Sequence, residues 1–173
     1  MLLPREIGMI RQARIEDASR IAEIHVCGWR YEYRGIFSDY ELFSQRQVST
    51  AITKMEKAIS GNAKILIYED EEDKIVKGFA WHGNSRDEDE KDAYELYAIY
   101  VQPEFTRHNV GSQLLNAVEK HAEEQQKKTL SVLVLAENTN GINFYKKNGF
   151  KFDGSSKTIK EWSKIENRMT KTL

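Results

Sequence analysis

The sequence predicts an α/β protein with one mixed sheet and flanking helices. Apolar stretches of strand length alternate with amphipathic stretches of helix length along the 173 residues. Two strand-length stretches, 94–101 and 130–136, are apolar at both parities, which is typical of strands buried on both faces. Hydrophobic residues make up 40% of the chain, enough to fill the core of one domain, and neither a linker nor an internal repeat interrupts it.

The expected elements follow one another in a regular order. In chain order they are a strand at 10–13, a helix from about 17, a helical region at 38–61, strands at 63–68 and 75–81, a strand at 94–101, a helix at 110–127, a strand at 130–136, a helix at 140–148, and strand segments at 150–152, 157–160 and 165–170. Ser38 and Glu41 have the spacing of a capping box, so a helix is expected to begin there. Gly61 is typical of a helix C-cap, and Pro103 ends the strand before it.

The two long helices carry apolar stripes that should face the sheet. Ile21 and Ile24 form the stripe of the first helix. Leu114, Leu115 and Val118 form that of the helix at 110–127. Helices that flank one shared sheet are therefore expected.

Charge and composition exclude several classes of function. Lysine and arginine (26 together) balance aspartate and glutamate (27), so the net charge is −1 and nothing favours nucleic-acid binding. No apolar run approaches the ~20 residues of a membrane helix, and residues 1–10 lack the apolar core of a signal peptide. The single cysteine, Cys27, cannot form an internal disulfide. We therefore expect a cytoplasmic protein without a membrane or nucleic-acid partner.

The segment 97–115 combines a buried strand, a short loop and the start of a long helix. This arrangement aims free main-chain amides and the positive end of the helix dipole at one point. Gly111 lets the backbone approach a ligand closely, and Arg107 and His108 add positive charge. The segment indicates a site for an anion such as a phosphate or pyrophosphate. The alternative is an ordinary strand-to-helix connection with a solvated arginine.

A second segment, 135–152, places a polar residue at the end of an apolar strand and a short helix after it. Asn138 and Tyr145 are seven residues apart and can line the same side of this junction, and Gly149 ends the helix. A phenol is a weak acid that is protonated at neutral pH. Tyr145 could therefore donate a proton or a hydrogen bond to a leaving group.

Together the two segments resemble the signature motifs of the GNAT superfamily of N-acetyltransferases. In the first motif Val101, Pro103 and Gly111 match, whereas Thr106 stands where the family usually has Gln or Arg, and Asn109 where it has its first glycine. Asn is the non-glycine residue that best tolerates a left-handed backbone, so the loop can still form. The second motif is matched by Asn138, Gly141, Phe144, Tyr145, Gly149 and Phe150.

The resemblance covers nearly the whole chain and implies a single acetyltransferase domain over 1–173. It implies an α/β (α+β) fold whose central sheet is mixed, mostly antiparallel and split by an acetyl-CoA cleft between 94–101 and 130–136. The pyrophosphate would lie on main-chain amides of 107–112, and the pantetheine would run along the backbone of 99–101. The residues implied to bind acetyl-CoA are Ile99, Tyr100, Val101, Arg107, His108, Asn109, Val110, Gly111, Ser112, Asn138 and Tyr145. No metal is required, and no cluster has metal-ligand spacing.

The implied reaction is direct attack of a deprotonated amine on the thioester. A main-chain amide near Ile99 or Tyr100 would hold the developing oxyanion. Tyr145 would protonate the departing thiolate. These roles come from the resemblance and are expectations for the structure.

The sequence offers three candidates for the residue that accepts the amine proton. Glu95 begins the central strand, and strict alternation would place it on the face of Tyr97, Ile99 and Val101. Apolar surroundings there would suit it to accept the proton, directly or through water. The alternative is a partly exposed charge at the start of a strand. His82 and His25 are weaker candidates, each expected to be a packing or surface histidine.

The acceptor is expected to meet the connection between the first two helices. Aromatic residues gather there (Trp29, Tyr31, Tyr33 and Phe37), and Trp29, Tyr33, Gly35 and Ile36 are similar to one bacterial branch of the family. The resemblance implies substrate contacts from Trp29, Tyr33 and Glu95, with core packing as the alternative for some of the aromatic residues. The acidic tracts 69–73 and 87–92 are expected to be solvated turns, although they would also suit a polycationic acceptor such as a polyamine.

The favoured function is acetyl-CoA-dependent transfer of an acetyl group to a primary amine of a small molecule or peptide. A catalytically weak or inactive acyl-CoA binding or sensor module is the rival. Thr106 and Asn109 favour this rival, and the presence of Tyr145 argues against it. A nucleotide-binding α/β protein is disfavoured because neither of its glycine-rich motifs is present. A homodimer is expected because many members of the family pair.

Overall fold

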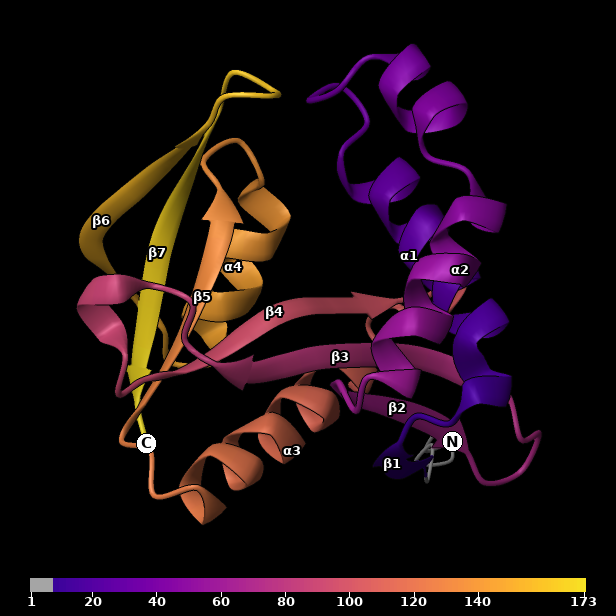
Figure 1. Ribbon diagram of the computed structural model, residues 1–173, viewed down its shortest axis with the longest axis horizontal. Coiled ribbons are helices and arrows are strands. Elements are labelled where there is room, and N and C mark those ends of the chain that lie inside the picture. Colours follow the sequence, from indigo (N-terminus) through magenta and orange to yellow (C-terminus); the bar gives the residue numbers. More distant parts are fainter. Residues whose placement is uncertain (1–7) are drawn as a thin grey trace, which may run out of the picture.

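The structure, a computed structural model that describes residues 8–173, contains one sheet of seven strands with helices on both faces (Figure 1). In sheet order the strands are β1 (Gly8–Gln12), β2 (Lys64–Asp70), β3 (Val76–Asn84), β4 (Tyr94–Val101), β5 (Thr129–Leu135), β7 (Lys164–Thr172) and β6 (Lys151–Ile159). Only β4 and β5 are parallel among these neighbours. The expected mixed, mostly antiparallel sheet is confirmed.

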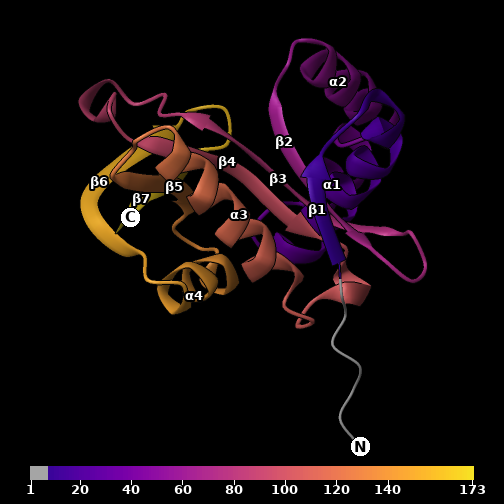
Figure 2. The same cartoon turned by 90° about the horizontal axis from the view of Figure 1, so that it is seen from below.

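The helices cover the two faces in pairs. They are α1 (Ala18–Glu32), α2 (Val48–Ser60), α3 (Val110–Glu124) and α4 (Thr139–Lys147). Helices α1 and α2 pack on one face, whereas α3 and α4 share the core of the other face (Figure 2). The helix expected to reach residue 127 ends at Glu124, because Gln126 adopts a left-handed backbone (φ 57°) and turns the chain into β5.

The predicted apolar stripes form the two cores. Ile21 and Ile24 of α1 are fully buried on the α1/α2 side, together with residues of β2 and β3. Leu114, Leu115 and Val118 of α3 are fully buried on the opposite side. The hydrophobic effect acting on these stripes fixes each helix to its face of the sheet.

The capping box at Ser38 is present, but the helix that it begins is not continuous. The Ser38 amide donates to the Glu41 carboxylate at 2.8 Å, and the Glu41 amide donates to the Ser38 hydroxyl at 3.3 Å. A π-helical stretch, Tyr40–Gln45, follows and ends at Arg46, whose backbone is extended. The regular helix α2 then begins at Val48.

Across the described strands, three register shifts interrupt the sheet, and those in β4 and β6 alter the expected strands. The two segments expected at 150–152 and 157–160 are parts of one strand, β6, which a register shift between Phe152 and Ser156 interrupts. Gly154 lies in this interruption and has a φ of +92°. In β4, Ala98 pairs with Trp81 and Leu96 pairs with His82, so Tyr97 is an extra residue. A bulge of one residue reverses the faces to which the preceding and following side chains point.

Strands β4 and β5 pair at one end and diverge at the other. Residues 94–96 pair with 130–132, and the ladder stops there. Beyond it β4 runs toward α1 while β5 runs toward α4 (Figure 1). The predicted opening between these two strands is therefore present in the structure. Within residues 8–173, no helix is long and apolar enough to cross a membrane.

Candidate active site

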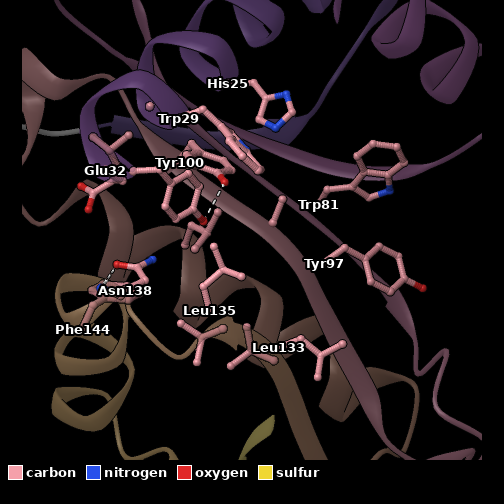
Figure 3. Close-up of a pocket in the computed structure, with 18 of the residues that line it drawn as sticks. His25, Trp29, Glu32, Trp81, Tyr97, Tyr100, Leu133, Leu135, Asn138 and Phe144 are labelled. Carbon is pink, nitrogen blue, oxygen red and sulfur yellow. Dashed lines mark hydrogen bonds between the residues drawn. The ribbon is translucent and has the colours of Figure 1, made fainter. Parts of the chain in front are cut away.

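A cavity of about 590 Å³ occupies the opening between β4 and β5. Figure 3 shows Tyr97 and Tyr100 of β4 on one side and Leu133 and Leu135 of β5 on the other. Further walls come from α1, from the start of α3, from α4 and from the β6–β7 hairpin. The cavity therefore joins segments that are distant in sequence, including both motif segments.

The loop before α3 has the backbone that the sequence required of it. Asn109 adopts a left-handed conformation (φ 63°) and is the residue directly before the helix, as its tolerance for that region predicted. Arg107 is also left-handed (φ 66°). Residues 107–109 are exposed, while the side chain of Val110 is buried in the core, so only its main chain is available to a ligand. The first amides of α3 thus lie at the positive end of the helix dipole.

After β4, two residues of the first motif segment line the cavity, one in the loop and one at the start of α3. Thr106 is one, and its hydroxyl donates to the carbonyl of Pro103 at 2.8 Å. Gly111 is the other, and a Cβ there would lie 3.3 Å from the ring of Phe144. Glycine therefore lets the start of α3 approach α4 across the cavity.

The edge of β4 that faces β5 presents its main chain to the cavity at 97–101. No residue of β5 pairs with this segment in the described part of the chain, so its alternate amides and carbonyls are available to a ligand. The side chains of Ile99 and Val101 pack on the α3 side, whereas Tyr100 packs on the α1 side. The three residues expected along the pantetheine are thus brought to the cavity.

Tyr145 and Asn138 meet at the same wall. Asn138 caps α4, because its side-chain oxygen accepts a hydrogen bond from the Gly141 amide at 2.9 Å. Tyr145 lies seven residues further along the chain, within α4, and its ring packs against Phe144 and Phe150. Both Asn138 and Tyr145 line the cavity. Burial raises the pKa of the Tyr145 phenol well above its ordinary value, which keeps it protonated.

Aromatic residues close the end of the cavity between the α1–α2 connection and the β6–β7 hairpin. The rings of Trp29 and Trp162 lie 5.5 Å apart, and Phe37 packs against both. The Tyr33 hydroxyl lies 3.4 Å from that of Tyr100. Trp29, Tyr31, Tyr33 and Trp162 line the cavity, whereas Phe37 is buried behind them. Some members of the cluster therefore form the cavity wall, whereas Phe37 belongs to the core.

The position of Glu95 differs from the expectation. Because Tyr97 is an extra residue in β4, Glu95 lies on the face opposite to Ile99 and Val101. Its carboxylate is buried but not in apolar surroundings, since the Arg86 amide donates to it at 2.8 Å and the Arg86 guanidinium forms a salt bridge with it. Arg86 lines the cavity and Glu95 does not.

The two histidines are packing residues. His82 is 1% exposed, its Nδ1 lies 2.9 Å from the Tyr94 hydroxyl, and burial lowers its pKa to about 3. His25 lines the cavity with its ring 5.1 Å from that of Tyr100. Burial, assisted by the charges of Lys54 and Arg46, lowers the pKa of His25 to about 4. Both imidazoles are therefore neutral at physiological pH.

Several cavity residues were not singled out from the sequence. Glu166 and Trp162 come from β7 and the hairpin before it, and Glu32 comes from the end of α1. Burial raises the pKa of Glu166. The only available signal for Glu166 was its position in the last strand, and nothing in the motifs marks it. Among residues 8–173, no group of histidine, cysteine, aspartate and glutamate side chains could hold a metal ion.

Comparison with known proteins agrees with the fold. The model of the acetyltransferase (GNAT) domain matches residues 61–152, just over half of the chain. The chain therefore belongs to the GNAT acetyltransferase family and is an acetyltransferase.

Curated relatives of the chain include N-acetyltransferases. A spermidine N(1)-acetyltransferase of Thermoplasma acidophilum is 27% identical over 151 residues, which cover 83% of this chain and 88% of the relative. The uncharacterized N-acetyltransferase YuaI of Bacillus subtilis is 33% identical over 106 residues, 61% of this chain and 59% of YuaI.

Solved structures share the fold. The PaiA N-acetyltransferase of Thermoplasma acidophilum, in complex with coenzyme A, superimposes with a TM-score of 0.76 at 24% identity, covering 96% of this chain and 99% of PaiA. A GCN5-related N-acetyltransferase of Rhodopseudomonas palustris gives a TM-score of 0.77 at 21% identity and covers both chains fully.

Proposed function

We propose that this protein transfers the acetyl group of acetyl-CoA to a primary amine of a small molecule or peptide by direct attack. One observation carries the proposal: residues 97–101 of β4, whose edge toward β5 pairs with no strand within 8–173, share a single cavity with the phenol of Tyr145. An acyl thioester needs both a polar main-chain edge and a proton donor. Two structures of the same fold are described with coenzyme A or acetyl-CoA, which supports this choice of co-substrate.

The amides at the start of α3 would hold the pyrophosphate. The loop contributes residues 107–112, with its left-handed positions at Arg107 and Asn109 directing successive amides toward one point. The pantetheine would then extend along Ile99–Val101 as an additional strand. An amide of Ile99 or Tyr100 would hold the oxyanion that forms on attack.

Tyr145 would protonate the sulfur as the thiolate leaves. Its buried phenol retains its proton across the physiological range, so it can act as a donor without titrating first. The same burial makes the phenolate costly, so the proton must be replaced within the catalytic cycle.

The acceptor would occupy the aromatic end of the cavity. Trp29 of α1 and Tyr33, the residue directly after this helix, line that end, and the rings there can pack on an aliphatic chain or on a cation. The relationship to a spermidine N(1)-acetyltransferase supports an amine acceptor. Glu95 would contribute by holding Arg86 at the wall of the cavity rather than by touching the substrate.

Thiol release tests the proposal against the sensor rival. The purified protein is incubated with acetyl-CoA and, separately, spermidine, lysine or a peptide with a free N-terminus. An acetyltransferase releases free thiol with at least one amine, well above the rate without amine. A binding module would instead be stabilised by acetyl-CoA, by mass action, without releasing thiol. The expected homodimer stays a prediction, and a light-scattering mass near 20.1 kDa would reject it.

A further inference from the structure

We infer that Glu166 binds the ammonium group of the acceptor and takes its proton before the attack on the thioester. This inference rests on the proposed acetyl transfer and adds a catalytic residue to it. Glu166 belongs to β7, outside both motif segments, and it lines the cavity.

Strand pairing places Glu166 on the correct side of the sheet. It lies directly opposite Leu135 in the antiparallel pair of β5 and β7. Residues that are directly opposite in such a pair project from the same face. Leu135 points into the cavity from β5 (Figure 3), so the carboxylate of Glu166 is presented to the same space.

The carboxylate of Glu166 is not committed to another group. It forms no hydrogen bond or ion pair with any residue among 8–173, although it is partly buried. The charged groups that act on it are Arg86 from the β3–β4 connection, Lys157 from β6 and Glu95 from β4. Burial has the largest effect and raises its pKa, the two cations lower it, and Glu95 raises it.

The other candidate bases are less suitable. Glu95 does not line the cavity, and its carboxylate is bonded to Arg86. His25 lines the cavity, but burial lowers its pKa to about 4, which makes its imidazole a weak proton acceptor. Glu32 also lines the cavity, at the end of α1 that faces α4. Unlike that of Glu166, its carboxylate already accepts a hydrogen bond, from Asn140 at 3.4 Å.

With this assignment every proton in the reaction is accounted for. The ammonium gives one proton to Glu166, and the free amine forms the nitrogen–carbon bond as the carbonyl oxygen becomes an oxyanion. The carbon–sulfur bond then breaks, and Tyr145 gives its proton to the sulfur. The second proton lost by the nitrogen restores Tyr145, and Glu166 releases its own proton to solvent. The products are the amide, free CoA and one proton.

Substitution of Glu166 by glutamine tests the inference through the pH dependence of kcat/KM. The probe is spermidine, lysine or the peptide, whichever the wild type acetylates fastest. At pH 7 we expect kcat/KM of Glu166→Gln to fall at least ~100-fold, the lower end of the usual range for general base catalysis. With spermidine or a lysine side chain the deficit should shrink about tenfold per pH unit between pH 7 and 9, because the free fraction of an amine of pKa near 10 rises by that factor. With the peptide, whose α-amine has a pKa near 8, the deficit should shrink up to about pH 8 and then level off.

Three comparisons separate a catalytic from a structural role. Glu166→Asp should recover part of the activity, because it keeps the carboxylate. Glu161→Gln, at an exposed site on the same hairpin, should match the wild type. Coenzyme A affinity and melting temperature should be unchanged in Glu166→Gln.

Two different results would overturn different claims. If kcat/KM of Glu166→Gln is within threefold of that of the wild type, and its pH profile has the same acid limb, Glu166 takes no part in the reaction. The proposal of acetyl transfer would be unaffected. A wild type that neither binds coenzyme A nor releases thiol with any of the three amines would instead refute the proposed function.

Discussion

Arg86 donates hydrogen bonds from its guanidinium to both oxygens of the Glu95 carboxylate. The main-chain amide of Arg86 adds another at 2.8 Å, so one carboxylate fixes both ends of this residue. The Glu95 side chain is 3% exposed and that of Arg86 is 60% exposed. The buried carboxylate of Glu95 therefore holds the exposed guanidinium of Arg86 at the cavity wall.

Glu95→Gln should affect stability and leave the acid limb of the pH–rate profile in place. Charged hydrogen bonds of this kind contribute about 1.5–3 kcal/mol, and the glutamine oxygen keeps part of that, so we expect a loss of about 1–2 kcal/mol in the free energy of unfolding. Denaturant unfolding and kcat/KM from pH 5 to 8 measure the two effects. A displaced acid limb would mean that Glu95 itself accepts the proton.

Asn109 offers a test of the loop before α3. Its φ is 63° and its side chain forms no capping hydrogen bond, so its contribution is a tolerated left-handed backbone. Asn109→Gly should keep or raise stability and coenzyme A affinity, whereas Asn109→Ala should lose about 1 kcal/mol of stability. Denaturant unfolding and calorimetry with coenzyme A provide the measurements. Strong loss of affinity in both variants would show that the asparagine side chain contacts the ligand.

Gly28 in α1 makes room for Tyr100. A Cβ on Gly28 would lie 2.5 Å from the ring carbon Cδ1 of Tyr100, so one of the two must move. Gly28→Ala should therefore reduce the free energy of unfolding by about 1–3 kcal/mol, the usual cost of overpacking. The control is Ser19→Ala at an exposed site in the same helix, which should stay within about 0.5 kcal/mol of wild type. Equal stability of the two variants would contradict this packing.

Most of the fold could be predicted because it depends on local periodicity. The stripes at Ile21 and Leu114 predict that α1 and α3 pack on the sheet, and both residues are fully buried there. The register shifts could not be predicted, because whether a residue such as Tyr97 is extra depends on how β3 pairs with β4. Because Tyr97 is an extra residue in β4, Glu95 lies on the face of the sheet opposite to Ile99 and Val101.

The candidate site also has a part that the sequence predicts and a part that it does not. Gly111, Asn138 and Tyr145 lie in two continuous segments whose spacing carries information, and all three line the cavity. Glu166 and Trp162 lie there only because β7 is inserted beside β5 in a particular register. Strand order and register are set by long-range packing, which a single sequence does not display.

His82 should make stability depend on pH. Its pKa is lowered by burial to about 3, and its Nε2 is buried without a hydrogen-bond partner among the described residues. Between pH 6.5 and 3 the unfolded chain therefore binds a proton that the folded chain does not, and stability falls as the pH falls. From pH 7 to 5 this amounts to about 2 kcal/mol for an unfolded-state pKa of 6.5.

His82→Gln isolates that contribution, because every other titrating group is shared with the wild type. The stability difference between the two proteins should narrow by about 2 kcal/mol between pH 7 and 5. Denaturant unfolding at pH 7, 6 and 5 provides the values. Parallel curves would show that the folded protein accommodates a charged His82.

Tyr145→Phe tests the proton donor while keeping the ring that packs against Phe144 and Phe150. Coenzyme A should bind as tightly as to the wild type, because the contacts of the ring survive. General acid catalysis contributes ~10²–10⁴-fold, and a thiolate is an easier leaving group than an alkoxide, so we expect kcat to fall at least ~10-fold.

The pH profile adds a second criterion for Tyr145. Burial raises the pKa of its phenol, so its ionisation should not appear as an alkaline limb between pH 6 and 9. The loss in kcat of Tyr145→Phe should therefore be nearly constant over that range, in contrast to the narrowing deficit expected for Glu166→Gln. A kcat within twofold of wild type from pH 6 to 9, measured by thiol release, would remove Tyr145 from the mechanism. The phenol would then serve only the packing of α4.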